Sequence, residues 1–178
     1  MITNDERVDP PMAGDETSTV LGFVEFLRHT LRIKTDGLDA DQLVRTLAPS
    51  TMTLGGMLKH LAYVEDNWFS IVLLGRGPMP PFDDVDWAAD MDWDWHSAVD
   101  DDSADLRALW SAAVERSREI TTELLATPAG LDTLSARANQ DGEHVNLRFV
   151  LLHMVEEYGR HAGHADLIRE SIDGVVGE

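Results

Sequence analysis

Apolar residues recur at intervals of three and four positions along four stretches of the chain, which is the pattern of an amphipathic helix. The stretches cover residues 17–34, from 50 or 51 to about 74, from about 103 or 105 to 126, and from 147 to about 171. Glycine or proline residues follow each stretch, and both residue types commonly end helices. Because no segment shows the alternation typical of a strand, the sequence predicts an all-α four-helix bundle with long loops. We expect it to form a single domain over residues 17–178.

The segments between these helices carry further signals. Residues 1–16 are polar and acidic and are expected to form a flexible N-terminal lead-in. A short helix is expected over residues 39–47, with Asp39 as its cap. Residues 129–145 are polar and predict a loop or a small hairpin. The expected caps of three long helices are Thr17 or Ser18, Ser50 or Thr51, and Asn146.

Residues 82–103 differ in character from the rest of the chain. Nine of these 22 residues are aspartates, and Trp87, Trp93 and Trp95 lie between them. The segment is too acidic to predict a packed helix, although tryptophan side chains favour partial burial. Two interpretations stay open, a surface loop anchored by its indoles and a lid over a pocket. An exposed tryptophan face over residues 87–95 would also offer a contact for a homodimer.

Charge and composition restrict the function. The chain has 14 basic and 33 acidic residues and a net charge of −19, which disfavours nucleic acids and anionic membranes as partners. No apolar run approaches the ~20 residues of a membrane span, and residues 1–16 lack the basic start and apolar middle expected of a signal peptide, so a cytoplasmic protein is expected. With no cysteine, a metal must be held by His, Asp or Glu, and any reacting thiol must come from a ligand.

The fourth predicted helix holds the densest group of candidate ligands. Three of the seven histidines lie between residues 153 and 166. Glu157 and His161 are four residues apart, so they share a face of the helix, and a helical wheel places both within or beside the core-facing stripe. Because an ionised glutamate does not enter a core without a partner, the pair predicts either half of a metal site or a buried Glu–His hydrogen bond.

The second predicted helix supplies a third candidate ligand. His60 borders the apolar stripe of that helix, so two helices direct imidazoles toward the core, as in metal sites of helical bundles. Three protein ligands with one open position are typical of a catalytic site. The predicted metal ligands are therefore His60, Glu157 and His161. His164 is a candidate fourth ligand or pocket residue, and His153 a candidate to orient Glu157.

Other residues receive smaller roles. Tyr158 and Arg160 are candidates to support the ligands or to line a pocket. His29, His96 and His144 are predicted not to bind the metal.

Residues 54–61 and 151–166, which include Leu54-Gly55-Gly56 and Arg160-His161-Ala162-Gly163-His164, resemble the DinB-like superfamily. This superfamily includes YfiT-type hydrolases and mycothiol- and bacillithiol-dependent S-transferases. The resemblance covers about residues 18–174. It implies a divalent metal, often zinc or nickel, held by one histidine of the second helix and two histidines of the fourth. His60 and His161 match two of these positions, whereas Glu157 stands where most members have histidine.

Glu157 makes the resemblance more specific. The mycothiol-dependent maleylpyruvate isomerase is similar in using a His, Glu, His set, so Glu157 favours the mycothiol-linked branch. The added negative charge favours a bound divalent ion. The absence of cysteine is consistent with this branch, because a protein thiol would compete for the metal.

The resemblance implies a metal-dependent thiol S-transferase that conjugates mycothiol to electrophiles for detoxification. Its partners would be a small-molecule thiol and an electrophile, with Zn²⁺ as the favoured metal and Ni²⁺ as the alternative. A thiol-dependent isomerase, a metal-dependent hydrolase and a non-catalytic metal-binding stress protein stay open as alternatives. The electrophile is not specified by the sequence. The loops expected to line its pocket are residues 82–103 and 129–145.

Overall fold

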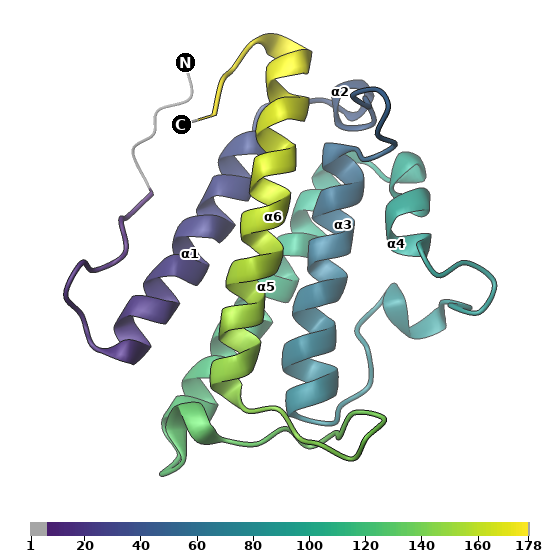
Figure 1. Cartoon of the computed structure of the whole chain (residues 1–178). Coiled ribbons are helices and arrows are strands. Elements are labelled where there is room, and N and C mark those ends of the chain that lie inside the picture. Colours follow the sequence, from purple (N-terminus) through teal and green to yellow (C-terminus); the bar gives the residue numbers. More distant parts are fainter. Residues whose placement is uncertain (1–6, 178) are drawn as a thin grey trace.

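The computed structural model describes residues 7–177. The long helices α1 (Glu16–Thr35), α3 (Leu54–Glu65), α5 (Ser103–Leu125) and α6 (Leu147–Asp173) form a bundle (Figure 1). Helix α1 packs along α6, and α3 packs along α5. Residues 7–177 contain no strand, only one isolated bridge between Leu134 and Asn146. The predicted all-α fold is therefore confirmed.

The second long helix changes its winding halfway along its length. From Asp66 the chain continues α3 as a π-helix, η1 (Asp66–Leu73). The carboxylate of Asp66 is buried, and its Oδ2 accepts a hydrogen bond of 2.7 Å from the Met79 backbone N–H. The helix thus ends close to the predicted position. The hydrogen bond between Asp66 and Met79 connects the π-helix η1 to the loop that follows it.

Side chains cap most helices, although not always at the predicted residue. Helix α1 is capped by Asp15, which accepts from the Ser18 backbone, so the prediction of Thr17 or Ser18 was wrong. Helix α3 is capped by Thr53 rather than by Ser50 or Thr51. Several hydroxyl or carboxylate residues lie in sequence before each helix, and the pattern does not distinguish which one has extended backbone.

Two other caps agree with the prediction. Asn146 caps α6 by accepting from the backbone of Phe149. Asp39 caps the short helix α2 (Ala40–Leu43) in a reciprocal pair with Gln42. This helix ends well before residue 47, where it was expected to end.

The acidic segment packs more closely than its composition predicts. It forms η2 (Phe82–Asp84), α4 (Trp93–His96) and η3 (Ser97–Asp100), and α4 and η3 contact α3. The indole of Trp87 packs on Tyr63 with ring centroids 4.5 Å apart, and the ammonium of Lys59 lies 4.3 Å from the centre of the Trp93 ring. Because the three indoles are half-buried against the bundle, they do not form the exposed face that the sequence suggested as a dimer contact.

Residues 129–145 form a loop that turns back on itself. The Ser135 backbone N–H donates to the Val145 carbonyl at 2.7 Å, and Leu134 and Asn146 form an antiparallel bridge, so the loop has hairpin-like pairing although it contains no strand. The loop contains η4 (Gly130–Asp132) and donates from the Ala136 backbone to Leu73 of η1 at 2.9 Å. It therefore closes the end of the bundle where η1 ends and α6 begins (Figure 1). Within residues 7–177, no helix is both long and apolar enough to cross a membrane.

A buried polar network joins the four long helices. Arg28 of α1 makes two hydrogen bonds, of 2.8 and 2.7 Å, to the Glu65 carboxylate of α3. Tyr158 of α6 donates to Glu65 at 2.7 Å and accepts from the Trp110 indole of α5 at 2.9 Å. Glu65 and Tyr158 are almost fully buried, and burial beside Glu65 raises the pKa of Tyr158. Tyr158 is thus a member of the core network, which differs from its predicted place beside the metal ligands.

Candidate metal centre

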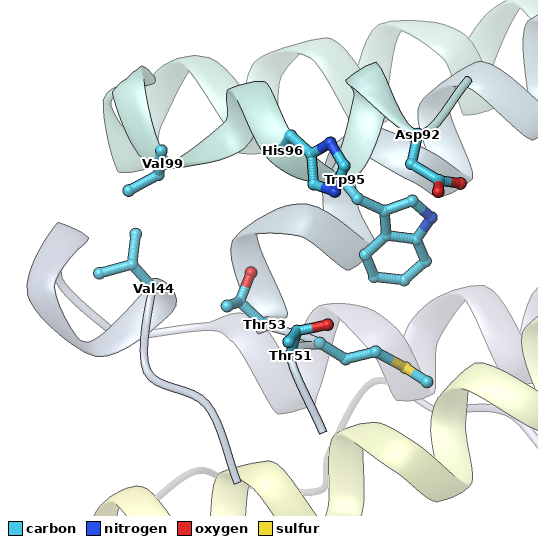
Figure 2. Close-up of a pocket in the computed structure, with 8 residues that line it drawn as sticks. Val44, Thr51, Thr53, Asp92, Trp95, His96 and Val99 are labelled. Carbon is cyan, nitrogen blue, oxygen red and sulfur yellow. The ribbon is translucent and has the colours of Figure 1, made fainter. Parts of the chain in front are cut away.

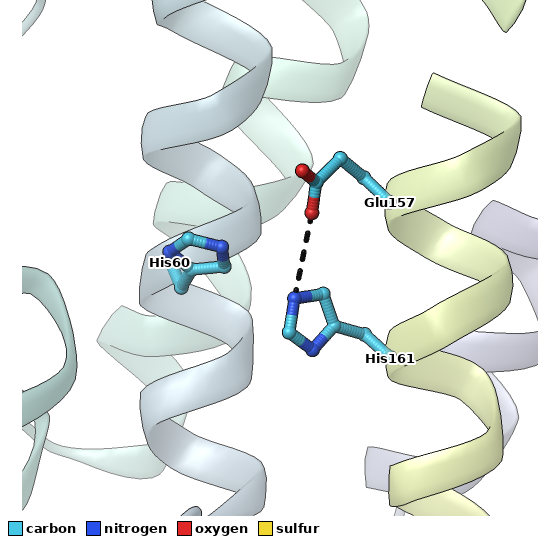
Figure 3. A group of neighbouring side chains, drawn as sticks. All are labelled: His60, Glu157 and His161. Carbon is cyan, nitrogen blue, oxygen red and sulfur yellow. Dashed lines mark ion pairs between the residues drawn. The ribbon is translucent and has the colours of Figure 1, made fainter. Parts of the chain in front are cut away.

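The three predicted ligands meet between two helices. His60 projects from α3, and Glu157 and His161 project from α6 toward it (Figure 3). One donor atom from each residue lies within 4.8 Å of the other two. His161 is buried, and His60 and Glu157 are half-buried. The structure therefore brings together the three residues that the sequence spacing selected, and their role as ligands stays a prediction.

His161 has the properties of a ligand without a competing hydrogen bond. Its Nε2 lies 3.6 Å from Glu157 Oε2, too far for a hydrogen bond. Its Nδ1 is buried and has no hydrogen-bond partner among the described residues. Burial, together with His60 and His164 nearby, lowers the pKa of His161 to about 4. The imidazole is therefore neutral at pH 7, the state that metal coordination requires.

His60 is oriented by a carboxylate from the acidic segment. Its Nδ1 lies 2.6 Å from Oδ2 of Asp94, a residue of α4 that is only 3% exposed. A carboxylate only accepts hydrogen bonds, so the proton of neutral His60 lies on Nδ1. This leaves the lone pair of Nε2 free, as in the carboxylate–histidine–metal arrangement of many metal sites.

The indole of Trp95 covers the two imidazoles. It stacks on His60 with ring centroids 4.6 Å apart, and its centroid lies 5.5 Å from that of His161. Its close approach to α3 depends on Gly56, where a Cβ atom would lie 2.9 Å from Trp95 Cε3. The acidic segment thus contributes both a hydrogen bond and an aromatic wall to the site.

These residues fit a divalent cation. Two imidazole nitrogens and one carboxylate oxygen form a donor set that zinc, nickel and similar ions accept. Burying the His161 imidazole with no hydrogen bond to either nitrogen costs free energy. Coordination of one nitrogen by a cation would offset part of that cost. With three protein donors, the set leaves room for a further ligand on the ion.

The neighbouring histidines occupy supporting positions. His153 Nε2 lies 3.5 Å from Glu157 Oε1, on the side of the carboxylate away from His161. The ring of His164 lies 5.7 Å from that of His161, and His164 is outside the set of three donors. His153, Glu156 and Glu157 form a second set within 4.8 Å. All three of its members come from one helix, and Glu156 is already paired with Arg160, so it is the weaker candidate.

The remaining candidates lie away from the three donors. Arg160 is exposed and pairs with Glu156. His96 pairs with Asp90 at 2.9 Å, and His144 Nδ1 lies 2.6 Å from the Ser135 carbonyl. His29 is half-buried on α1. None of His29, His96 and His144 belongs to either candidate set found in residues 7–177.

A pocket of about 560 Å³ has Trp95 among its lining residues. It opens between the start of α3 and the segment α4–η3 (Figure 2). Residues 129–145, also expected to line a pocket, are not part of its lining and close the opposite end of the bundle (Figure 1). The lining consists of Val44, Thr51, Met52, Thr53, Asp92, Trp95, His96 and Val99.

Sequence reasoning missed Asp94. It is one of nine aspartates in 22 residues, and nothing in that run distinguishes it except its place between Trp93 and Trp95. A carboxylate between two indoles that both favour burial was the one available signal.

A comparison with protein-family models identifies the family of the chain. The model described as mycothiol S-transferase matches residues 19–174, which include every donor described above. A search of curated proteins finds no match to this sequence. The chain belongs to the mycothiol S-transferase family, a DinB-like family.

Proposed function

We propose that the protein is a metal-dependent thiol S-transferase that conjugates mycothiol to small electrophiles. One observation carries the proposal: a donor set of His60, Glu157 and His161 within 4.8 Å, in a chain of the mycothiol S-transferase family. The chain has no cysteine, so the attacking sulfur must belong to the co-substrate.

His60, Glu157 and His161 would hold the cation, with Zn²⁺ favoured and Ni²⁺ as the alternative. When bound, such a cation lowers the pKa of a coordinated thiol and so supplies a thiolate at neutral pH. The negative charge of Glu157 would partly neutralise the ion.

Other side chains prepare the site for this role. The hydrogen bond from His60 to Asp94 fixes which imidazole nitrogen faces the donor set. The low pKa of His161, about 4, keeps that ring neutral at pH 7 although no side chain among residues 7–177 accepts a hydrogen bond from it. The Trp95 indole covers one side of both rings and limits the access of water, which would compete with the thiol. The thiolate, whose proton passes to solvent, would form a carbon–sulfur bond while the bond between that carbon and its leaving group breaks; with monochlorobimane the products are a thioether and chloride.

The ligand assignment is tested by metal content. The purified chain, His60→Ala and His161→Ala are loaded with Zn²⁺, desalted and analysed by mass spectrometry. We expect about one ion per chain in the wild type and none in either variant, because two protein donors do not make a catalytic-type site. His96→Ala is the matched control, since His96 lies outside the donor set, and should keep full metal content. Full metal content in both ligand variants would refute the set.

The reaction is tested by conjugation. Loaded protein is incubated with monochlorobimane and mycothiol, bacillithiol or glutathione in turn, and the fluorescent thioether is measured. We expect turnover with mycothiol that is lost in His161→Ala. Turnover with no thiol preference, or none at all, would contradict the proposal. Hydrolysis of esters or amides without added thiol would instead assign a hydrolase, and isomerisation of maleylpyruvate without thioether formation would assign an isomerase.

A further inference from the structure

A second pocket, of about 210 Å³, gathers basic residues between α1 and α5. Three of the chain's 14 lysine and arginine residues are in its lining, against one glutamate. The lining consists of Arg28, His29, Arg32, Trp110, Ser111, Val114, Glu115 and Arg118. In a chain with a net charge of −19, this lining has the opposite sign to the protein as a whole. A cleft lined by one sign of charge concentrates ions of the other sign, so the pocket favours an anionic ligand.

The spacing of these residues along two helices brings the guanidinium groups together. Arg28 and Arg32 are four residues apart on α1, and Ser111 and Arg118 are seven residues apart on α5, so each pair shares one face of its helix. Arg118 also reaches across to Glu25 of α1, with its Nε 3.1 Å from Glu25 Oε1. The two helices therefore present their basic side chains to the same space.

Buried carboxylates hold Arg28 and Arg118 in place without using all of their donors. Glu25 accepts from both arginines, at 2.7 Å from Arg28, and Glu65 accepts two hydrogen bonds from Arg28. A guanidinium has five N–H donors, and these contacts of Arg28 use three of them. Neither glutamate lines the pocket. Arg28, which is only 4% exposed, is therefore a fixed cation with donors left for a ligand.

The other carboxylates pair with the arginines in solvent. Arg118 pairs with Glu115, whose side chain is 65% exposed. Arg32 lies 3.6 Å from Asp36, whose side chain is 42% exposed. Ion pairs exposed to this degree contribute little free energy, so a ligand with a higher charge can displace them.

Three arginines on two helices suit a phosphate group better than a carboxylate. A phosphate monoester carries a charge of about −1.5 to −2 at pH 7 and has three strong acceptor oxygens. Arginine binds phosphate through two parallel hydrogen bonds, and a tetrahedral group can be bound in this way from more than one side. A carboxylate has one charge and two oxygens in a single plane. The Ser111 hydroxyl adds a further donor in the lining.

We propose that the pocket between α1 and α5 binds a phosphate group, held by Arg28, Arg32 and Arg118. None of the three candidate metal ligands lines this pocket, so the proposal is independent of the proposed function. Free inorganic phosphate and a small phosphomonoester both present this group. The buried side chains of Trp110 and Val114 would contact only the carbon body of an ester.

The test measures anion binding by calorimetry at constant ionic strength. Inorganic phosphate, phenyl phosphate and acetate are titrated in turn into the zinc-loaded protein. We expect a phosphate ligand to bind at least about tenfold more tightly than acetate, the effect of one hydrogen bond to a charged group. Tighter binding of inorganic phosphate would assign the free ion, and tighter binding of phenyl phosphate a phosphomonoester. No binding of either phosphate ligand, or an equal affinity for acetate, would overturn the proposal.

Two added charges on the same helix locate the site. Ser111→Glu keeps all three arginines but places a carboxylate in the pocket, so the affinity for phosphate should fall by at least about tenfold. Ala112→Glu is the matched control, because Ala112 is exposed on α5 and outside the lining, and it should bind phosphate like the wild type. Equal affinities in the two variants would place the phosphate elsewhere and overturn the proposal.

A further pair of variants distinguishes this pocket from phosphate bound to a metal ion. His161→Ala removes a candidate metal ligand and should keep the full affinity for phosphate, whereas Arg118→Gln should lose at least about tenfold. Urea denaturation shows that each variant is folded before binding is measured. The reverse result, a loss in His161→Ala and none in Arg118→Gln, would assign the phosphate to the metal centre and overturn the proposal.

Discussion

Asp94 Oδ2 lies 2.6 Å from Nδ1 of His60, so a residue of the short helix α4, in the acidic segment, holds an imidazole that belongs to α3. The carboxylate is buried, and the neighbouring Trp95 stacks on the same imidazole. The candidate metal centre therefore has three structural sources, α3, α6 and the acidic segment. Metal affinity should depend on residues that bind no metal themselves.

The first prediction concerns Asp94→Asn. The substitution keeps the size of the side chain but removes the charge that holds the His60 proton on Nδ1. Loss of such a supporting carboxylate typically weakens metal binding by about 10- to 100-fold. Competition with a chromophoric chelator measures the Zn²⁺ affinity directly. Asp100→Asn, an exposed aspartate of the same segment, should bind Zn²⁺ like the wild type, and equal affinities in the two variants would contradict a role for Asp94.

The sequence was sufficient for the parts of the site that lie on regular helices. Glu157 and His161 are one helical turn apart, so a period of 3.6 residues fixes their relative positions. His60 could be added because a second apolar stripe fixes which face of its helix points inward. The all-α fold follows from the same periodicity.

The parts contributed by loops could not be predicted in this way. No period relates Asp94 to the eight other aspartates around it, and its burial depends on how Trp87 and Trp93 pack on α3. Tyr158, in contrast, lies on a regular helix, where the helical period does fix its direction. It follows Glu157 directly, so it lies about 100° around the helix from that residue, and its hydroxyl reaches Glu65 in the core.

The second prediction concerns Gly56→Ala. A Cβ atom there would lie 2.9 Å from Trp95 Cε3, closer than packed atoms tolerate, so the indole must move away from His60. Helix propensity alone would stabilise the variant by about 1 kcal/mol, but we expect a lower melting temperature and altered tryptophan fluorescence. Gly163→Ala is the matched control, since nothing lies within 4 Å of its Cβ position. A Gly56→Ala protein that gains as much stability as the control would contradict the contact.

The third prediction concerns the buried network. Glu65→Ala removes the two hydrogen bonds that the buried Arg28 guanidinium makes to Glu65 and leaves it only the contact with Glu25, and breaking such a buried pair costs about 3–5 kcal/mol. Urea denaturation measures the change. Tyr158→Phe removes the hydrogen bond to Glu65 and the one accepted from the Trp110 indole; it should cost about 1–3 kcal/mol, without loss of Zn²⁺. Glu119→Ala on the exposed face of α5 is the control and should change stability little. Similar losses for Glu65→Ala and Glu119→Ala would show that the network does not stabilise the bundle.

The fourth prediction concerns pH and the metal-free protein. The pKa of His161 is about 4 in the folded chain and near 6.5 for an unperturbed histidine. The unfolded chain therefore binds the extra proton first as the pH falls. The contribution of His161 is complete above pH 6.5 and is lost between pH 6.5 and 4, by up to about 3 kcal/mol.

Many carboxylates also titrate at the lower end of this range, so the contribution of His161 must be isolated by difference. Urea denaturation of the metal-free wild type and of His161→Gln is followed from pH 8 to pH 4. The glutamine side chain has no proton to gain, so the free energy of unfolding of the variant should fall less steeply below pH 6.5 than that of the wild type. The curves of the two proteins should therefore converge or cross as the pH decreases. The lowered pKa of His153, also caused by burial, acts in the same direction in both proteins and cancels. Parallel curves over the whole range would mean that His161 titrates normally and is not kept neutral for a metal.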